Sequence, residues 1–229
     1  MKCVILAAGE GVRMRPLTND KPKPLLLISG RPMIEHIINA LPKEIDELIV
    51  VIGYKGEQIK EFLSEKFQGL KVQYVWQKEK LGTGHALKLC QPYLGRDKFL
   101  MLFADDIHGR EGLECLLKHD CAILTAEVDD PRRFGVISVD ELGRIINFEE
   151  KPENPKSNIV STGAMALDGR IFKYEPIRHE NGEYYLTTMI EQMLKEHDVF
   201  AAKSSLWIST ATPDDLKKAE EILRAEKVL

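Results

Sequence analysis

The sequence lacks any long hydrophobic run and any marked excess of charge of one sign. No apolar stretch is long enough to cross a bilayer, so no membrane-spanning helix is expected. The 32 Lys and Arg residues face 36 Asp and Glu residues, and the net charge of −4 argues against a nucleic-acid-binding surface. Neither a membrane nor a nucleic acid is therefore expected as a partner, and no pattern in the sequence sets an oligomeric state.

Cysteine is scarce, and the sequence contains no C-x-x-C motif. The four cysteines are scattered at Cys3, Cys90, Cys115 and Cys121, and three of them lie in apolar runs. We expect small buried residues of a reducing compartment and no metal cluster built from them. Because the chain starts directly on an apolar strand pattern, we also expect no signal peptide and a cytoplasmic location.

What is present is an alternation of strand-like and helix-like segments. The 229 residues, 44% of them hydrophobic, support one sizeable core, so residues 1–229 are expected to form a single domain. Continuous apolar runs typical of buried parallel strands occur at 3–7, 48–52, 72–76, 99–103 and 122–126. Helical patterns lie between them at 33–40, 57–67, 83–91 and 112–119. This order predicts an α/β fold that is Rossmann-like and doubly wound, with a mostly parallel mixed sheet.

The pattern changes after Asp130. Residues 134–139 and 144–148 predict the two strands of a hairpin, 150–158 a loop, and 160–167 a further strand. Helices are predicted at 186–196 and 213–227, the second with two acidic residues in its first turn. We expect residues 1–128 and 129–229 to form two halves of one domain, the second adding a small β-rich lobe to the same sheet.

The most informative stretch follows the first strand. Gly9 and Gly11 come first, then Arg13, then Lys23 between two prolines. Small residues let a backbone approach a ligand closely, and the free amides of such a loop can bind an anion. Arg and Lys complement a phosphate as a planar fork and as a point charge. Pro24 also favours an extended backbone at Lys23, so the pattern predicts a rigid polyphosphate-binding loop.

The glycines alone leave other readings open. A bare Gly-x-Gly turn is often only structural, and this one lacks both the third glycine of the dinucleotide fingerprint and the Gly-Lys-Ser/Thr ending of the P-loop. A dinucleotide-dependent oxidoreductase on the same kind of sheet is the weaker alternative. No acidic residue stands in the expected context to bind a ribose.

Acidic residues follow two of the predicted strands. Asp105 and Asp106 come directly after a buried strand, where a carboxylate facing a phosphate loop is a natural ligand for Mg²⁺. Glu150 and Lys151 end another strand, where a carboxylate can accept sugar hydroxyls and a lysine can neutralise a phosphate. The alternatives are a capping Asp in a turn and a solvated charged loop.

A second glycine-containing segment opens the helix predicted at 83–91. Gly82 allows a ligand to approach closely, and Thr83 offers a hydroxyl and a free amide. Gln77, just after a strand, carries an amide that can pair with the edge of a base. The alternative is a helix N-cap with glycines needed for packing, and His85 is more simply read as a structural histidine.

Together these segments resemble the sugar-1-phosphate nucleotidylyltransferases, also called nucleotide-sugar pyrophosphorylases. Leu-Ala-Ala-Gly-Glu-Gly-Val-Arg-Met-Arg-Pro-Leu-Thr at 6–18, with Lys-Pro-Lys-Pro-Leu at 21–25, is similar to the opening of that family. Further similar motifs follow in the family's order at 77, 81–86, 104–106, 134–136, 150–152, 162–163, 182–187 and 207–216. The resemblance covers nearly the whole chain.

The resemblance implies a reaction. A pyrimidine nucleoside triphosphate, UTP or dTTP, and a hexose or N-acetylhexosamine 1-phosphate give a nucleotide sugar and pyrophosphate, with Mg²⁺ as the cofactor. The motifs look like those of both glucose-1-phosphate thymidylyl- and uridylyltransferases and N-acetylglucosamine-1-phosphate uridylyltransferases. No left-handed β-helix, as found in bifunctional members, is expected here. The sugar phosphate is mostly dianionic, with a second pKa of roughly 6, so the chemistry needs alignment rather than a general base.

The resemblance also implies roles for individual residues. Arg13 and Lys23 would be catalytic, and Asp105 would hold Mg²⁺. The nucleotide would be bound in the 1–128 half by Leu6, Ala7, Ala8, Gly9, Gly11, Gln77, Gly82 and Thr83. The sugar phosphate would be bound in the 129–229 half by Gly135, Glu150, Lys151 and Thr162.

Four positions depart from the family pattern: Ala104 and Ala211 stand where the family usually has Gly, and the other two replace an Asp. Ser209 stands where the family usually has an Asp that is the second metal ligand, and Thr188 stands where an Asp usually follows Leu-Thr. A serine hydroxyl binds a metal more weakly than a carboxylate, although Asp106 could compensate. The sequence therefore leaves a catalytically degenerate nucleotide-sugar-binding protein as the alternative to an active enzyme.

Overall fold

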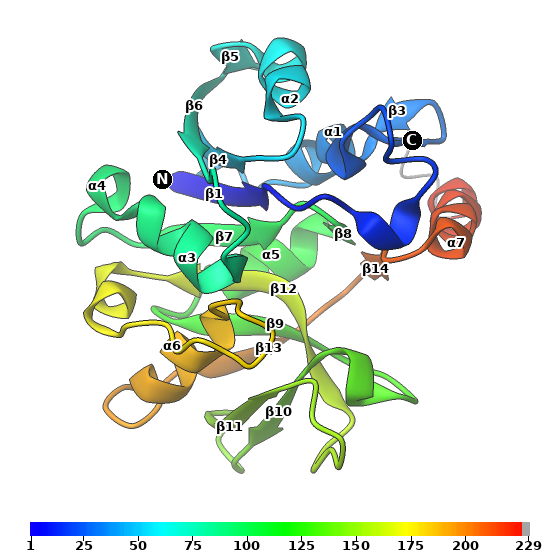
Figure 1. The fold of residues 1–229 in the computed structure, drawn as a ribbon. Coiled ribbons are helices and arrows are strands. Elements are labelled where there is room, and N and C mark those ends of the chain that lie inside the picture. Colours follow the sequence, from blue (N-terminus) through cyan, green and yellow to red (C-terminus); the bar gives the residue numbers. More distant parts are fainter. Residues whose placement is uncertain (226–229) are drawn as a thin grey trace.

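The structure of the protein is a computed structural model that describes residues 1–225. One large sheet forms its centre (Figure 1). Its strands are β1 (Lys2–Ala7), β4 (Glu47–Ile52), β5 (Lys66–Phe67), β6 (Leu70–Trp76), β7 (Phe99–Phe103), β9 (Ala122–Glu127), β10 (Gly135–Val139), β11 (Ile145–Glu150), β12 (Ile159–Leu167) and β13 (Phe200–Lys203). Their order is β11-β10-β12-β7-β1-β4-β6-β5, and β9 pairs with β12 and with β13. Two small antiparallel pairs lie outside it, β2 (Leu27–Ile28) with β3 (Arg31–Pro32) and β8 (Asp106–His108) with β14 (Trp207–Ser209).

The middle of the sheet is parallel and covered on both faces. Strands β7, β1, β4 and β6 run parallel in that order. Alternate residues of β1 enter two different apolar cores, Ile5 on one face and Val4 on the other. Helices α1 (Met33–Asn39), α2 (Gly56–Leu63), α5 (Arg110–Leu116) and α7 (Pro213–Ala225) contribute to the first core, and α3 (Gly82–Leu89), α4 (Gln91–Leu94) and α6 (Leu186–Met193) to the second. The predicted doubly wound α/β fold is confirmed.

The second half joins the same sheet through β12. This strand pairs antiparallel with β7, with Ala164 opposite Leu102, and further along with β9 and β10. The strand predicted at 122–126 is present as β9 and runs in the same direction as β7, because both strands pair antiparallel with β12, and β9 also pairs in parallel with β13. The sequence did not predict that β12 would lie between β9 and β7. The first four residues of β9 are buried, and a continuous apolar run indicates burial but not which strands are neighbours.

The predicted hairpin is present as β10 and β11, and with the start of β12 it forms a β-rich lobe at the bottom of Figure 1. Its turn is held by Asp140, whose carboxylate accepts from the backbone N–H groups of Leu142 and Arg144 at 2.9 Å each. This side chain is the local reason why the Asp-Glu-Leu-Gly segment reverses the chain.

Several helix ends differ from the prediction. Helix α2 ends at Leu63 rather than at 67, because Ser64 adopts φ 55° and turns the chain into β5. Helix α5 lies two to three residues earlier than predicted, and α6 ends at Met193. Helix α7 is described to Ala225, and the last two residues predicted for it lie outside the described residues. No helix within residues 1–225 has the length and apolar character to cross a membrane.

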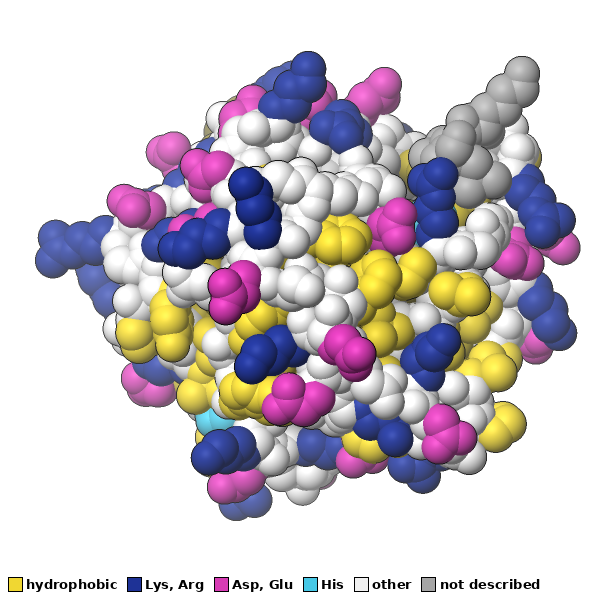
Figure 2. Space-filling model, turned by 90° about the horizontal axis from the view of Figure 1, so that it is seen from above, with side chains coloured by type: hydrophobic (Ala, Val, Ile, Leu, Met, Phe, Trp, Pro, Cys, Tyr) yellow, Lys and Arg dark blue, Asp and Glu magenta, His cyan; other side chains and the backbone are white. Residues whose placement is uncertain are grey.

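Charged side chains of both signs are mixed over the surface seen from above. Figure 2 shows Lys and Arg interspersed with Asp and Glu on this face, with no broad area of one sign.

Candidate active site

A cavity of about 470 Å³ lies where β1 and β7 lead into the loops at their carboxyl ends. Nearly every residue that the sequence nominated lines it. These are Leu6, Ala7, Ala8, Gly9, Gly11, Arg13, Lys23, Gln77, Gly82, Thr83, Asp105, Gly135, Glu150, Lys151 and Ser209. Residues spread over two hundred positions thus meet in one place, with contributions from both halves of the chain.

Thr162 is the exception. Its side chain is 1% exposed, and its hydroxyl donates to the backbone oxygen of Leu124 at 3.0 Å, away from the cavity. Its neighbours Ser161 and Gly163 line the cavity instead. The resemblance implied Thr162, but successive side chains of a strand point to opposite faces, so the geometry favours its neighbours.

The loop after β1 is fixed by contacts with the segment that carries Lys23. Gly11 adopts φ 60°, and a Cβ on it would lie 3.1 Å from both the Lys23 Cβ and the Thr18 methyl carbon. The Thr18 hydroxyl donates to the Gly11 carbonyl at 2.9 Å. Glycine is therefore required by conformation and by space, and the loop is held in place rather than left free to move.

Lys23 reaches the acidic residues at the end of β7. Its ammonium lies 2.8 Å from Oδ2 of Asp105, and Lys23 itself is 7% exposed. Burial alone would raise the pKa of the Asp105 carboxyl, but the charge and hydrogen bond of Lys23 outweigh it and hold that pKa below its usual value. Asp105 is thus kept ionised at the cavity.

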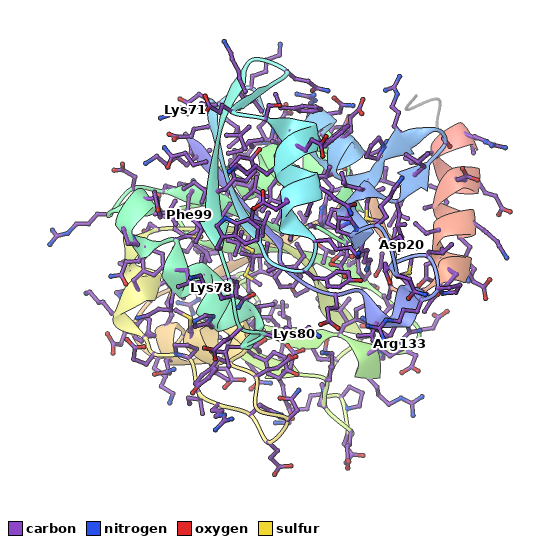
Figure 3. All side chains as sticks on the ribbon, turned by 45° about the horizontal axis from the view of Figure 1, so that its top comes forward. Asp20, Lys71, Lys78, Lys80, Phe99 and Arg133 are labelled. Atoms are coloured by element: carbon purple, nitrogen blue, oxygen red, sulfur yellow. The ribbon has the colours of Figure 1, made fainter. Side chains whose placement is uncertain are left out.

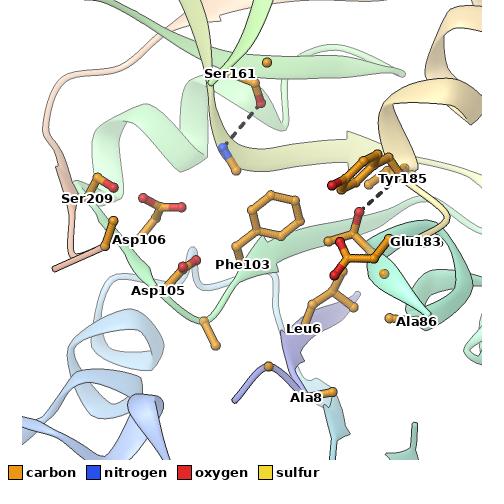
Figure 4. A pocket seen from close by; sticks show the side chains of 18 of the residues that line it. Leu6, Ala8, Ala86, Phe103, Asp105, Asp106, Ser161, Glu183, Tyr185 and Ser209 are labelled. Atoms are coloured by element: carbon orange, nitrogen blue, oxygen red, sulfur yellow. Dashed lines mark hydrogen bonds between the residues drawn. The ribbon is translucent and has the colours of Figure 1, made fainter. Parts of the chain in front are cut away.

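Asp106 is the more buried of the two acids. Its Oδ1 accepts from the indole N–H of Trp207 at 2.9 Å. Ser209 stands opposite Asp106 in the register of β8 and β14, and Figure 4 shows Asp105, Asp106 and Ser209 grouped on one side of the pocket. Burial and the neighbouring Asp105 raise the pKa of the Asp106 carboxyl well above its ordinary value.

Gly163 leaves the space into which Asp106 points. It adopts φ 81°, and a Cβ there would lie 2.7 Å from the Phe103 ring and 2.8 Å from Oδ2 of Asp106. The missing side chain therefore lets β12 pass close to the acidic pair.

On the side of the cavity near α3, Gln77 is held by two acceptors. Its amide nitrogen lies 2.9 Å from the Gly82 carbonyl oxygen and 3.0 Å from Nδ1 of His85. The Thr83 hydroxyl oxygen accepts from the backbone N–H of Leu186 at 3.0 Å, which ties the start of α3 to the start of α6. His85 has the structural role expected of it, since it supports Gln77.

The wall formed by the second half carries Glu150 and Lys151. Glu150 accepts from the Thr187 hydroxyl at 2.6 Å and pairs with the Lys151 ammonium at 2.9 Å. That ammonium also lies 5.2 Å from the centre of the Tyr185 ring. Burial would lower the pKa of Lys151, but the Glu150 carboxylate raises it above the usual value, so this lysine stays charged.

The two positions that replace a family Asp fall in different places. Ser209 lines the cavity, whereas Thr188 does not. The Thr188 hydroxyl accepts from the backbone N–H of Ile177 and donates to the Tyr185 carbonyl, both at 2.9 Å. Thr188 therefore fastens the segment before α6 and has no contact with the acidic pair.

Sequence reasoning did not nominate several residues that line the cavity. Phe103, Phe148, Arg133 and Lys80 come from separate segments, and Figure 3 labels the last two. Lys80 forms an ion pair of 2.5 Å with Glu10 of the first loop. No local sequence pattern marks aromatic and charged side chains of this kind as site residues, because only the fold brings them together. For Lys80, its partner Glu10 lies within the opening motif and could have pointed to it.

Known proteins are similar to this chain over nearly its full length. A model of the family described as "Nucleotidyl transferase" matches residues 2–226. The bifunctional protein GlmU of Methanocaldococcus jannaschii is 36% identical over 226 residues, which cover 97% of this chain and 54% of GlmU. The UTP–glucose-1-phosphate uridylyltransferase AglF of Haloferax volcanii is 32% identical, with 99% of this chain and 98% of AglF covered. The chain thus spans about half the length of the GlmU relative.

A solved structure has the same fold. It is a protein of Bacillus anthracis provisionally named a glucose-1-phosphate thymidylyltransferase, in complex with sucrose. It matches with a TM-score of 0.87 and 31% identity over 98% of this chain and 95% of that one. The similarity therefore extends over both halves of the chain and includes both sides of the cavity.

Proposed function

Because this chain belongs to the nucleotidyl transferase family, we propose that it transfers a nucleotidyl group from UTP or dTTP to a sugar 1-phosphate. The products would be a nucleotide sugar and pyrophosphate. One observation carries the proposal: the glycine loop and the Lys23–Asp105 pair share a single cavity with Glu150 and Lys151. That arrangement suits two phosphorylated substrates that must react with each other.

The triphosphate fits the side of the cavity built from the first loop. The amides from Ala8 to Gly11 and the Arg13 guanidinium would hold the β- and γ-phosphates and stabilise the departing pyrophosphate. Lys23, fixed against Asp105, would neutralise charge on the phosphates as it develops. Gly9 has no atom within 4 Å of its notional Cβ, so a phosphate chain can approach the backbone there.

The sugar phosphate fits the opposite wall. Glu150 would accept sugar hydroxyls, and Lys151 would bind the phosphate. A phosphate oxygen of the sugar attacks the α-phosphorus, the bond from that phosphorus to the pyrophosphate oxygen breaks, and no proton transfer is needed because the attacking phosphate is already ionised. The residues thus contribute alignment and charge stabilisation.

The residues around Asp105 suit a magnesium ion. Within residues 1–225 no group of three or more His, Cys, Asp and Glu side chains is arranged to hold a metal by itself. Mg²⁺ in such sites is commonly held by one or two carboxylates together with substrate phosphates and water, which matches Asp105 and Asp106 with Ser209 beside them. When bound there, the ion would offset phosphate charge and polarise the α-phosphate.

The orientation of Gln77 favours uracil or thymine. Its amide nitrogen is engaged with the Gly82 carbonyl, which can only accept a hydrogen bond, so the amide oxygen remains for the ligand. Uracil and thymine present an N–H at ring position 3, whereas cytosine presents an acceptor there. This supports UTP or dTTP over CTP, with Gly82 and Thr83 completing the base site.

The sugar is proposed as a hexose or N-acetylhexosamine from the names of the relatives and the motifs. A cytoplasmic location is proposed with it. All four cysteines are unpaired, and three are buried, which supports a reducing compartment.

The second candidate, a degenerate nucleotide-sugar-binding protein, is motivated by Ser209 at the metal side of the cavity. A panel of UTP, dTTP, CTP, ATP and GTP against glucose, galactose, mannose and N-acetylglucosamine 1-phosphates separates the two. Pyrophosphate release is measured with Mg²⁺, and Asp105→Asn is the matched control. Turnover with a uracil or thymine nucleotide that the control lacks supports the proposal. A wild-type protein that binds nucleotide sugars but releases no pyrophosphate in any pairing is the degenerate form.

A further inference from the structure

Both amide hydrogens of Gln77 are already committed. Its nitrogen donates to the Gly82 carbonyl at 2.9 Å and contacts Nδ1 of His85 at 3.0 Å. Gln77 is 9% exposed and lines the cavity, and among residues 1–225 no group donates to its amide oxygen. The side chain therefore offers one unused group to a ligand, and that group is an acceptor.

The two acceptors come from the first turn of α3. Gly82 and His85 are three residues apart at the start of α3, and both contact the amide nitrogen of Gln77. The Gly82 carbonyl sets which end of the amide is the nitrogen. Nδ1 of His85 can accept the second hydrogen only if the ring is neutral and carries its proton on Nε2.

We propose that His85 is a positioning residue that fixes the Gln77 amide for bases with an N–H at ring position 3 and against cytosine. The inference rests on the proposed function, because it places the base of the nucleotide at Gln77. To pair with the ring nitrogen of cytosine, the amide would have to turn over. Its oxygen would then face the Gly82 carbonyl and the lone pair of His85, two repulsive contacts in place of two hydrogen bonds.

Two substitutions separate this role from a packing role. His85→Leu removes the acceptor for the Gln77 amide and puts an apolar side chain of similar size in its place. His85→Asn keeps an acceptor oxygen close to the position of Nδ1. Dissociation constants for UTP and CTP are measured by titration calorimetry with Mg²⁺ and without sugar phosphate. This readout requires binding but no turnover.

The wild-type protein is expected to bind UTP more tightly than CTP. In His85→Leu this preference should fall by about two- to tenfold, the value of one neutral hydrogen bond. In His85→Asn it should stay close to wild type. A preference that is unchanged in His85→Leu, with both nucleotides weakened equally, overturns the inference and leaves the proposed function standing. If the wild type binds no nucleoside triphosphate, the proposed function fails and the inference fails with it.

A measurement on the unaltered protein covers the case in which His85→Leu does not fold. Nitrogen-15 NMR of the histidine rings reports which nitrogen carries the proton. A neutral His85 with its proton on Nε2 supports the inference. A proton on Nδ1 overturns it, since that nitrogen could then not accept from Gln77.

Discussion

Lys23 and Asp105 are 82 positions apart in the sequence, yet the lysine ammonium donates to the aspartate Oδ2 at 2.8 Å within the cavity. The pair joins the segment that contacts the glycine-containing loop after β1 to the end of β7. It also sets the ionisation of Asp105, because the lysine charge counteracts burial. Lys23 is therefore placed to affect both the proposed phosphate site and the acidic residues beside it.

Replacing Lys23 with Met should lower kcat by about 10²–10³-fold, since a buried positive charge near the reacting phosphates is lost. Lys21→Met is the matched control, because Lys21 lies in the same Lys-Pro-Lys-Pro segment, is exposed and does not line the cavity. Steady-state pyrophosphate release measures both variants. Equal rates for the two variants would exclude a catalytic role for Lys23.

Asp106 and Ser209 face each other across β8 and β14, so a carboxylate can be moved between them. Asp106→Asn should weaken the apparent affinity for Mg²⁺ by roughly tenfold, because one of the two carboxyl groups proposed to hold the ion is removed. Adding Ser209→Asp to that variant should restore most of the affinity. Binding of Mn²⁺, followed by electron paramagnetic resonance without substrates, reports the change independently of turnover.

Adding Ser209→Asp to the unaltered protein tests the degenerate alternative. An active wild-type enzyme should gain little from the substitution. Strong activation of a silent wild type would instead show that this position had lost a necessary ligand.

Replacing either of two glycines at the first loop with alanine should have different effects, on ligand binding for Gly9 and on stability for Gly53. Gly9→Ala places a methyl group in open space at the cavity, so stability should hold while UTP binding weakens by about tenfold or more, as in an overpacked site. Gly53→Ala places a Cβ 2.8 Å from the backbone oxygen of Ala8 and should lower the unfolding free energy by about 1–3 kcal/mol. Urea unfolding and nucleotide titration of both variants check this. A large loss of stability in Gly9→Ala would contradict the finding that no atom lies within 4 Å of a Cβ at this position.

The free energy of unfolding should depend on pH through Asp168. Burial would raise the pKa of this carboxyl, but the hydrogen bonds and charge of Arg170 lower it below the usual value. Because the folded pKa lies below the unfolded one of about 3.9, the stabilisation is present above that pH and is lost as the pH falls further. Asp168→Asn should therefore destabilise the protein at pH 7 by about 1 kcal/mol and by less near pH 3.

Asp130 provides the comparison for that experiment. It makes the same kind of side-chain pair with Arg132, two positions later, but on the exposed surface. Asp130→Asn should change the urea midpoint at pH 7 by less than Asp168→Asn. The reverse order would mean that burial does not strengthen the pairing.

The sequence was sufficient for the parallel centre of the sheet and for most of the cavity. Strands such as β1 and β4 are apolar runs followed by glycine-containing segments, so their position in the sequence can be predicted from hydrophobicity. Their parallel pairing follows from the helix that connects them. The carboxyl ends of such strands collect ligand-binding residues, which is why Gly9 and Asp105 could be nominated together.

What could not be predicted depends on contacts between distant segments. The place of β9 in the sheet, separated from β7 by the antiparallel strand β12, is not encoded in its apolar run. The inward turn of Thr162 depends on the phase of β12, and a shift of one residue exchanges the faces of a strand. The small pair of β8 and β14 joins segments a hundred residues apart, so no local pattern places Ser209 opposite Asp106.

Strand β12 has a consequence for how the two proposed substrates are brought together. One part of it pairs with β7, beside the acidic residues, and the other with β10, which leads toward Glu150 and Lys151. Although its pairing with β9 shifts register between Ser161 and Met165, one strand of one sheet joins the two walls. The spacing between the two phosphate sites is then built into the sheet, and adaptation to substrates of different size is left to the side chains and loops at the rim.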